Sequence, residues 1–296
     1  MKRVTDQPGI WALWGSPGRG KSTYLTYAVN ELHKQEVPTI RHHYFLSLAD
    51  SGDRNSFADI ASSFMDQMVV RYRDAVKGLE ETPTELRKWV GACGAHFAKK
   101  GKPFVVVVDG LDHVAREYAD LSQMNQLFNA LLPCPPNVTV LVGTQRVADS
   151  CLPLRLIQHV TSESWIEVPQ MDRDAVQRWV VLQHKAGRVL LSNVHSTETE
   201  QHELGAIGDA FYATSLGHPL HLIYSFEAMV RHGLAFSPEE IARLPSCPEG
   251  DIRKYYAGLW RDLSPSAKQT IHAMAGSGFR WTATMLWSTR RNRPSP

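Results

Sequence analysis

Residues 15–22 read Gly15-Ser16-Pro17-Gly18-Arg19-Gly20-Lys21-Ser22 and match the phosphate-binding pattern G-x-x-x-x-G-K-[ST] at every fixed position. An apolar segment, residues 10–14, precedes them, and a helical pattern of apolar residues follows from Lys21. The glycines let the backbone curl so that N–H groups point toward an anion, and the helix N-terminus adds partial positive charge. The sequence therefore predicts a strand, a phosphate-binding loop and a helix in that order.

The side chains at the end of this loop suit a nucleoside triphosphate with Mg²⁺. Lys21 can reach the β- and γ-phosphates, and the Ser22 hydroxyl can ligate Mg²⁺. The backbone that would surround the phosphates comprises Gly15, Ser16, Pro17, Gly18, Arg19, Gly20, Lys21, Ser22 and Thr23. We expect ATP as the nucleotide and Mg²⁺ as its metal, and these residues do not distinguish ATP from GTP.

A second acidic motif follows a buried strand. The run Phe104-Val105-Val106-Val107-Val108-Asp109 is continuously apolar before its carboxylate, as in a central strand covered on both faces. Asp109 therefore lies where parallel sheets bind ligands, and we expect it to support Mg²⁺ together with Ser22. Asp112 is the candidate general base or water-positioning group, with a structural cap or a hinge as the alternative. His113 is a further candidate for accepting the proton.

The composition excludes several classes of protein. The chain has 296 residues, a formal net charge of +2, 43% hydrophobic and 21% charged residues, which is typical of a soluble globular protein. Its apolar runs are far too short for a membrane span, and the N-terminus has no signal pattern. Four cysteines without a CxxC pair indicate reduced thiols: Cys93, Cys134, Cys151 and Cys247. We expect a cytoplasmic protein with no membrane contact.

The chain changes character near residue 170. Before it, short apolar segments alternate with amphipathic ones, which predicts an α/β fold with a parallel sheet flanked by helices. The expected strands are 10–14, 39–48, 104–109, 138–143 and 165–168, and the expected helices are 21–35, 56–76, 84–99, 118–132 and 150–157. After it we expect helices at 172–185, 201–214, 219–232, 238–244, 250–262 and 265–275, with a loop at 187–200.

Several segments together resemble one family. They are the loop at 15–22, the string Val105-Val106-Val107-Val108-Asp109-Gly110-Leu111-Asp112, Val140-Leu141-Val142-Gly143-Thr144-Gln145-Arg146, Arg41-His42-His43-Tyr44-Phe45 and Ser215-Leu216-Gly217-His218-Pro219-Leu220. This set, which covers residues 9 to about 275, is similar to the STAND signal-transduction ATPases, NACHT-like P-loop proteins related to AAA+ and origin-recognition ATPases. The resemblance implies a sheet in the order 5-1-4-3-2, a helical lid, and then a winged helix.

The resemblance also implies an ATP-dependent switch, closed with ADP and oligomeric with ATP. By this likeness Arg146 would sense the γ-phosphate and Pro219 would pack near the adenine. From the residues alone, Arg146 follows a strand end and faces the ligand crevice, or it is a surface arginine. The segment Gly217-His218-Pro219 also reads as a helix stop and restart. His113 stands where many relatives have glutamate, so we expect slow hydrolysis.

The domains expected on this basis are a P-loop NTPase core at 1–170, a helical lid at 171–248, a partial winged-helix-like segment at 249–287 and a disordered tail at 288–296. Little of the chain remains for effector or sensor modules, which indicates a truncated or split member that works with a partner protein. Bacterial relatives of this kind often serve antiviral defence. The histidine pairs His42/His43 and His218/His221 lack the arrangement of a metal site and are read as structural.

The leading hypothesis is a regulatory ATPase that hydrolyses MgATP slowly and forms a homo-oligomer when ATP is bound. One alternative is a P-loop kinase of a small molecule, which would use an arginine-rich lid. Another is a DNA-binding, origin-recognition-like ATPase, which would need a basic helix within 250–287. That range is mildly basic, with more cationic than acidic side chains, so nucleic-acid binding is left open. The cationic residues are Arg253, Lys254, Arg261, Lys268 and Arg280, and the acidic ones are Asp251 and Asp262.

Overall fold

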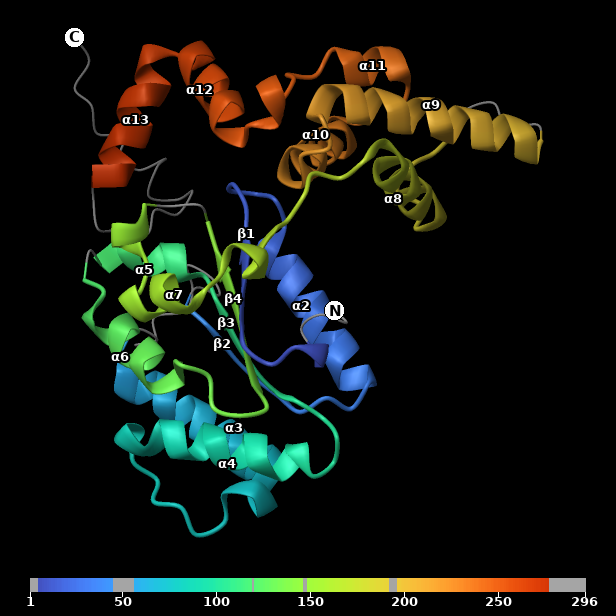
Figure 1. Cartoon of the computed structure of the whole chain (residues 1–296). Coiled ribbons are helices and arrows are strands. Elements are labelled where there is room, and N and C mark those ends of the chain that lie inside the picture. Colours follow the sequence, from blue (N-terminus) through green and yellow to red (C-terminus); the bar gives the residue numbers. More distant parts are fainter. Residues whose placement is uncertain (1–4, 45–55, 119, 146–147, 192–195, 277–296) are drawn as a thin grey trace.

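A five-stranded parallel sheet forms the centre of the first part of the chain (Figure 1). The computed structural model describes residues 5–44, 56–118, 120–145, 148–191 and 196–276. The strands are β1 (Ile10–Trp14), β2 (Thr39–His43), β3 (Phe104–Asp109), β4 (Val138–Thr144) and β5 (Trp165–Glu167). Their order is β2-β3-β4-β1-β5, which is 5-1-4-3-2 read from the other edge, so the predicted fold class and strand order are confirmed.

The two faces of the sheet carry unequal layers (Figure 1). Helix α2 (Lys21–Lys34) covers one face, where its buried residues Leu25 and Val29 meet the β3 side chains Val105 and Val107. The other face carries the larger core, in which alternate β3 residues meet the remaining helices of this part. These are α3 (Phe57–Val76), α4 (Leu86–Ala98), α5 (Leu111–Tyr118), α6 (Ser122–Leu131) and α7 (Leu154–His159). Every residue of β3 is buried, as its continuous apolar run predicts.

The structure corrects two expected elements of this part. Helix α5 directly follows β3, whereas no helix is expected from the sequence between residues 109 and 118. Gly110 makes the turn with a φ of +86°, and Leu111 and Val114 then bury one side of the short helix. Strand β2 ends at His43, and residues 45–48 of the expected 39–48 strand lie outside the described residues.

The segment from residue 171 is helical, as expected, and has a core of its own. It contains α8 (Arg173–Lys185), α9 (Thr197–Ser215), α10 (Pro219–His232) and α11 (Pro238–Ala242). Asp172 begins α8 by accepting a hydrogen bond from Ala175 N at 2.6 Å. Helix α9 begins inside the expected loop, because Ser196 caps it by accepting from Thr199 N at 3.2 Å. We call residues 171–248 the lid.

Two further helices follow the lid, α12 (Ile252–Asp262) and α13 (Pro265–Gly276), after the short turn η4 (Pro248–Gly250). The other short turns of the chain are η1 (Pro83–Glu85), η2 (Asp149–Cys151) and η3 (Ser162–Ser164). The rest of the predicted winged-helix-like segment, 277–287, and the predicted tail, 288–296, lie outside the described residues. Among the helices that the structure describes, each is too short or too polar to cross a bilayer.

Candidate phosphate-binding site

The loop at 15–22 joins the carboxyl end of β1 to the N-terminus of α2, as predicted. From β1 the chain proceeds to β2 at one edge of the sheet, and from the neighbouring β4 it proceeds to β5 at the other edge. The carboxyl ends of β1 and β4 therefore lie at a switch point, where open parallel sheets bind ligands. Gly18 and Gly20 take left-handed conformations, with φ of +73° and +83°, and Gly20 begins α2. The backbone thus has the curled form that an anion-binding loop needs.

Lys21 folds back over the loop. Its Nζ donates to Gly15 O at 3.0 Å and to Ser16 O at 3.2 Å. The pKa of Lys21 is lowered because burial, the largest effect, outweighs the opposing effect of the nearby carboxylates of Asp112 and Asp109. A partly desolvated ammonium group beside the loop backbone is well placed to gain from an added anion.

Asp109 is the last residue of β3, and the residue is 4% exposed. One carboxylate oxygen, Oδ2, lies 3.4 Å from His43 Nδ1 on the adjacent strand. The other oxygen lies against Gly143 of β4, where an added Cβ would come within 2.3 Å of Asp109 Oδ1 and 2.5 Å of Leu25 Cδ1. Gly143 therefore makes the space in which this carboxylate lies across the end of the sheet. In the sequence Gly143 is the end of the expected strand 138–143 and part of the resembled segment 140–146, and neither pattern indicates this role.

The residues available for Mg²⁺ fit that ion. Asp109 offers a carboxylate and Ser22, exposed in the first turn of α2, offers a hydroxyl; these are the hard oxygen donors that Mg²⁺ prefers. Within the described part of the chain, no three His, Cys, Asp or Glu side chains are grouped as a metal site. Mg²⁺ is commonly bound by one or two protein ligands together with phosphate oxygens and water, so this donor set suits a metal that arrives with a nucleotide.

Asp112 lies in the first turn of α5 and is 4% exposed. Its Oδ1 accepts a hydrogen bond from Gln145 N at 3.0 Å, which ties α5 to the residue after β4. Its Oδ2 is buried and has no hydrogen-bond partner among the described residues. Buried polar atoms are nearly always paired, so a water molecule or ligand is the expected partner of this oxygen. The carboxylate therefore joins two elements through one oxygen and leaves the other available.

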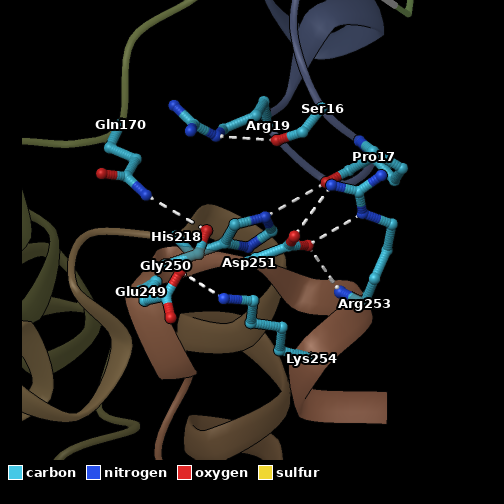
Figure 2. A network of polar contacts seen from close by, with 10 residues as sticks. All are labelled: Ser16, Pro17, Arg19, Gln170, His218, Glu249, Gly250, Asp251, Arg253 and Lys254. Atoms are coloured by element: carbon cyan, nitrogen blue, oxygen red, sulfur yellow. Dashed lines mark hydrogen bonds and ion pairs between the residues drawn. The ribbon is translucent and has the colours of Figure 1, made fainter. Parts of the chain in front are cut away.

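The lid touches the phosphate-binding loop directly (Figure 2). His218 Nε2 lies 3.1 Å from Pro17 O, and Leu220 N donates to Gly18 O at 3.2 Å. Pro219, predicted near the adenine, is half-buried between these two residues at the start of α10. Histidine spacing indicated a structural role for His218, but no local pattern could reveal a partner 201 positions away.

The other loop residues and the predicted sensor are placed as follows. Arg19 Nε donates to Ser16 Oγ at 3.0 Å, so this side chain lies along the loop (Figure 2). Thr23 is exposed on α2. Arg146, the predicted γ-phosphate sensor, lies outside the described residues, one position beyond Gln145. The structure therefore brings together the loop, Lys21, Asp109, Asp112 and the start of α10.

Comparisons with known proteins find one family model that matches part of the chain and several remotely similar structures. The model of the family "Nephrocystin 3, N-terminal" matches residues 1–144. No curated protein matches the chain. Similar solved structures include the Aeropyrum pernix ORC2 protein in ADPNP–ADP complexes (TM-score 0.45, 12% identity, 80% of this chain and 61% of that one). A second is the A. pernix ORC1 protein in complex with DNA (TM-score 0.44, 12% identity, 96% of this chain and 71% of that one). A third is AMPPCP-bound DnaA from Aquifex aeolicus (TM-score 0.41, 13% identity, 77% of this chain and 58% of that one).

These likenesses are remote, and the chain spans 61% of the ORC2 protein and 58% of DnaA. The family model ends at the last residue of β4 and so includes the loop and both acidic residues but none of the lid. The P-loop NTPase fold rests on this chain's own loop, strand order and strand ends. The fold alone does not identify the activity of this chain, which must be argued from the residues of the site.

Proposed function

We propose that this chain is a regulatory switch that binds MgATP at residues 15–23, hydrolyses it slowly, and transmits the nucleotide state through the lid. The observation that carries this proposal is the direct contact between the start of α10 and the loop, at Pro17 O and Gly18 O. Because the lid bonds to the backbone that would surround the phosphates, a change in that backbone must also change the lid's contacts.

Each residue at the crevice has a part in this proposal. Lys21 exchanges its two loop carbonyls for the β- and γ-phosphates, while the loop N–H groups hold the phosphate oxygens. Ser22 and Asp109 would hold Mg²⁺, which would supply positive charge next to the phosphates. Arg146, by the resemblance, reads the γ-phosphate, and Pro219 packs against the adenine.

Asp112 is proposed to orient the attacking water through Oδ2. Its other oxygen is engaged by Gln145 N, which fixes the orientation of the carboxylate. His113 follows Asp112 where many relatives of the resembled family have a second carboxylate. A single oriented oxygen supports slow turnover, which suits a switch whose output is the bound state rather than the product.

The finer proposal is a STAND-type, NACHT-like signal-transduction ATPase that assembles into a homo-oligomer with ATP and relaxes with ADP. It rests on the motifs that resemble that family, and an effector or sensor partner and a role in bacterial antiviral defence rest on the same resemblance. The charged side chains on the lid do not favour a small-molecule kinase. Arg173 pairs with Asp209 and Arg188 with Glu227, so both arginines are engaged within the lid itself.

The DNA-binding alternative gains no support from the first turn of α12. Arg253 Nη2 lies 2.8 Å from Asp251 Oδ2, and Lys254 pairs with Glu249 (Figure 2). Both cations therefore lie beside carboxylates of the same short segment, which lowers the net positive charge at the start of α12. A gel-shift titration with duplex DNA at low salt tests this directly, and tight, salt-sensitive binding would restore the alternative.

The proposed switch is tested by measuring the mass of the protein in solution with MgATP, with MgADP and without nucleotide. Light scattering after size exclusion should show a larger species with MgATP alone. Lys21→Ala should stay at the nucleotide-free mass under all three conditions. An unchanged mass in the wild type, or assembly of the variant with MgATP, would contradict the coupling of nucleotide state to assembly.

A further inference from the structure

The contact between the lid and the loop involves two consecutive carbonyl groups. Pro17 O faces the ring of His218, and Gly18 O accepts from Leu220 N. The approach is close enough to require a glycine at position 18, because an added Cβ there would lie 2.7 Å from Leu220 Cβ and 2.8 Å from His218 Cε1. The first turn of α10 is thus packed directly on the loop backbone.

The hydrogen bonds around His218 define its tautomer. Pro17 O is only an acceptor, so Nε2 must carry the proton. His221 N is a donor 3.4 Å from Nδ1, so Nδ1 must be unprotonated. The side chain is fully buried, and this burial lowers the pKa of His218, with Arg19 acting in the same direction. His218 is therefore a neutral ring that points a fixed donor at the loop.

His218 Nε2 and Leu220 N contact the two peptides on either side of Gly18, and the N–H of the second peptide, Arg19 N, also donates to Ser16 O at 3.4 Å. Both peptides adjoin Gly18, whose missing side chain permits several backbone orientations. In a planar trans peptide the C=O and N–H groups point in opposite directions, so fixing Pro17 O also fixes the N–H of Gly18. N–H groups are what such a loop offers to phosphate, so their orientation before binding affects affinity.

The residue type also indicates a task beyond capping the helix. His218 begins α10 as its N-cap, a position where Ser, Thr, Asp and Asn are preferred because their short side chains reach the first turn. Its cap bond is long, at 3.4 Å, whereas its bond to the loop is 3.1 Å. A histidine reaches both groups, and a shorter capping side chain would not reach Pro17 O.

We propose that His218 is a positioning residue for nucleotide binding: from the lid, its Nε2–H holds the Pro17–Gly18 peptide in the orientation in which the loop binds phosphate. This inference rests on the proposed nucleotide site and adds a residue outside the motif at 15–22. It also makes the lid part of the binding site, because the loop's orientation depends on the first turn of α10.

Two substitutions separate the loop contact from the cap. His218→Asn keeps a side-chain oxygen for His221 N but is too short for Pro17 O, whereas His218→Gln carries an amide donor at about the reach of Nε2. His221→Asn is the matched control, because His221 is also buried on α10 but bonds to Pro245 O, at 2.9 Å, instead of the loop. Calorimetric titration of the full chain with MgADP and MgATP gives the dissociation constants. Thermal unfolding gives the melting temperature, which reports the stability of the lid.

The expected result is that His218→Asn weakens both nucleotides by about three- to tenfold, the value of one lost hydrogen bond. His218→Gln should recover most of that loss, and His221→Asn should bind as the wild type does even if its melting temperature falls. Wild-type affinity in His218→Asn, equal weakening by Gln and Asn, or equal weakening by His221→Asn would overturn the inference. A wild type that binds neither nucleotide would instead contradict the proposed function, and the inference would fall with it.

A spectroscopic measurement on the unaltered ring gives a second test. Histidine ¹⁵N labelling and long-range ¹⁵N–¹H correlation spectra distinguish the two neutral tautomers and the cation, and the signal missing from His218→Asn assigns the ring. At neutral pH the ring should be the neutral Nε2–H tautomer, and its Nε2 signal should shift when MgADP is added. A cationic ring, an Nδ1–H tautomer or a signal indifferent to bound MgADP would overturn the inference.

Discussion

Gly143 and Asp109 show how one missing methyl group shapes the acidic end of the crevice. The carboxylate of Asp109 fills the space where any other residue at position 143 would place its Cβ. The two residues face each other in the β3–β4 register, so the contact follows from strand pairing. Position 143 is therefore as specific a part of the site as the carboxylate itself.

We predict that Gly143→Ala lowers the free energy of unfolding by about 1–3 kcal/mol, because a well-packed site receives an extra carbon. It should also weaken the Mg²⁺-dependent part of nucleotide binding, since Asp109 must move. Urea unfolding and titration of MgADP against ADP in EDTA measure the two effects. Gly205→Ala on α9, where no heavy atom lies within 4 Å of the added Cβ, should instead be neutral or stabilising by up to about 1 kcal/mol. Equal behaviour of the two variants would refute this role of Gly143.

Asp112 offers a way to separate structure from chemistry within one side chain. Asparagine at this position keeps an oxygen for Gln145 N while replacing Oδ2 with an amide that cannot accept a proton. We predict that Asp112→Asn lowers ATP turnover by at least about 100-fold, a typical contribution of a positioned base, with nucleotide affinity little changed. A phosphate-release assay beside calorimetry checks this, and unchanged turnover would leave Asp112 with a structural role alone.

The elements that the sequence analysis predicted best have strong local signals. Strand β3 and helices α2 and α10 appear within a residue of their expected bounds, because a continuous apolar run, a glycine-lysine loop and a Gly-x-Pro turn mark their ends. Helix α5 was missed because its eight residues carry only a short apolar pattern, Leu111 and Val114, directly after a strand. Its start depends on Gly110 and on the packing of β4, neither of which local periodicity can reveal.

The turn at Gly217-His218-Pro219 was read in two ways, as a helix stop and restart or as a nucleotide-binding motif. Leu216 and Gly217 take left-handed conformations and Pro219 begins α10, so the stop and restart is present. The same turn also contacts the loop through His218. The candidate site was therefore predictable wherever it lies on a motif. Its contacts to the lid were not, because they join residues about 200 positions apart.

Two histidines of α10 make the stability of the lid depend on pH. Burial lowers the pKa of His218 and of His221 below the ordinary 6.5. Arg19 and His221 add to this lowering at His218, and Asp251 and the backbone bonds oppose it. Between the lowered pKa and 6.5 the unfolded chain binds more protons than the folded one, so the free energy of unfolding decreases as pH falls through this range. The two buried histidines therefore leave the free energy of unfolding at its full value above about pH 7, and the free energy of unfolding decreases progressively as pH falls below about 6.5.

We therefore predict weaker stability at pH 5.5 than at pH 7.5, with a smaller difference in His221→Asn. Urea unfolding followed by tryptophan fluorescence measures it. Trp179, 5.0 Å from the Phe226 ring and 6.3 Å from the Phe211 ring, reports the lid core. The variant removes one of the two titrating rings and leaves the carboxylates unaltered. The same pH dependence in variant and wild type would show that buried histidines do not cause it.

A continuous set of contacts runs across the molecule from the loop to α12. His218 contacts the loop, and one turn further along α10 His221 bonds to Pro245 O and lies edge-on to Tyr255, with ring centroids 4.6 Å apart. Tyr256 then donates to Tyr224 Oη at 3.1 Å. Helix α10 thus lies between the candidate phosphate site and the C-terminal helices, where a switch needs a rigid connection.

The proposed switch requires MgATP binding at the loop, and a calorimetric titration of the wild type beside Lys21→Ala measures that binding. The lysine would form charge-assisted bonds worth about 1.5–3 kcal/mol, so its loss should weaken binding by about ten- to a hundredfold. We predict saturable binding of one nucleotide per chain in the wild type and that loss in the variant. Absence of binding in the wild type, or equal affinity in the variant, would contradict the proposed nucleotide site.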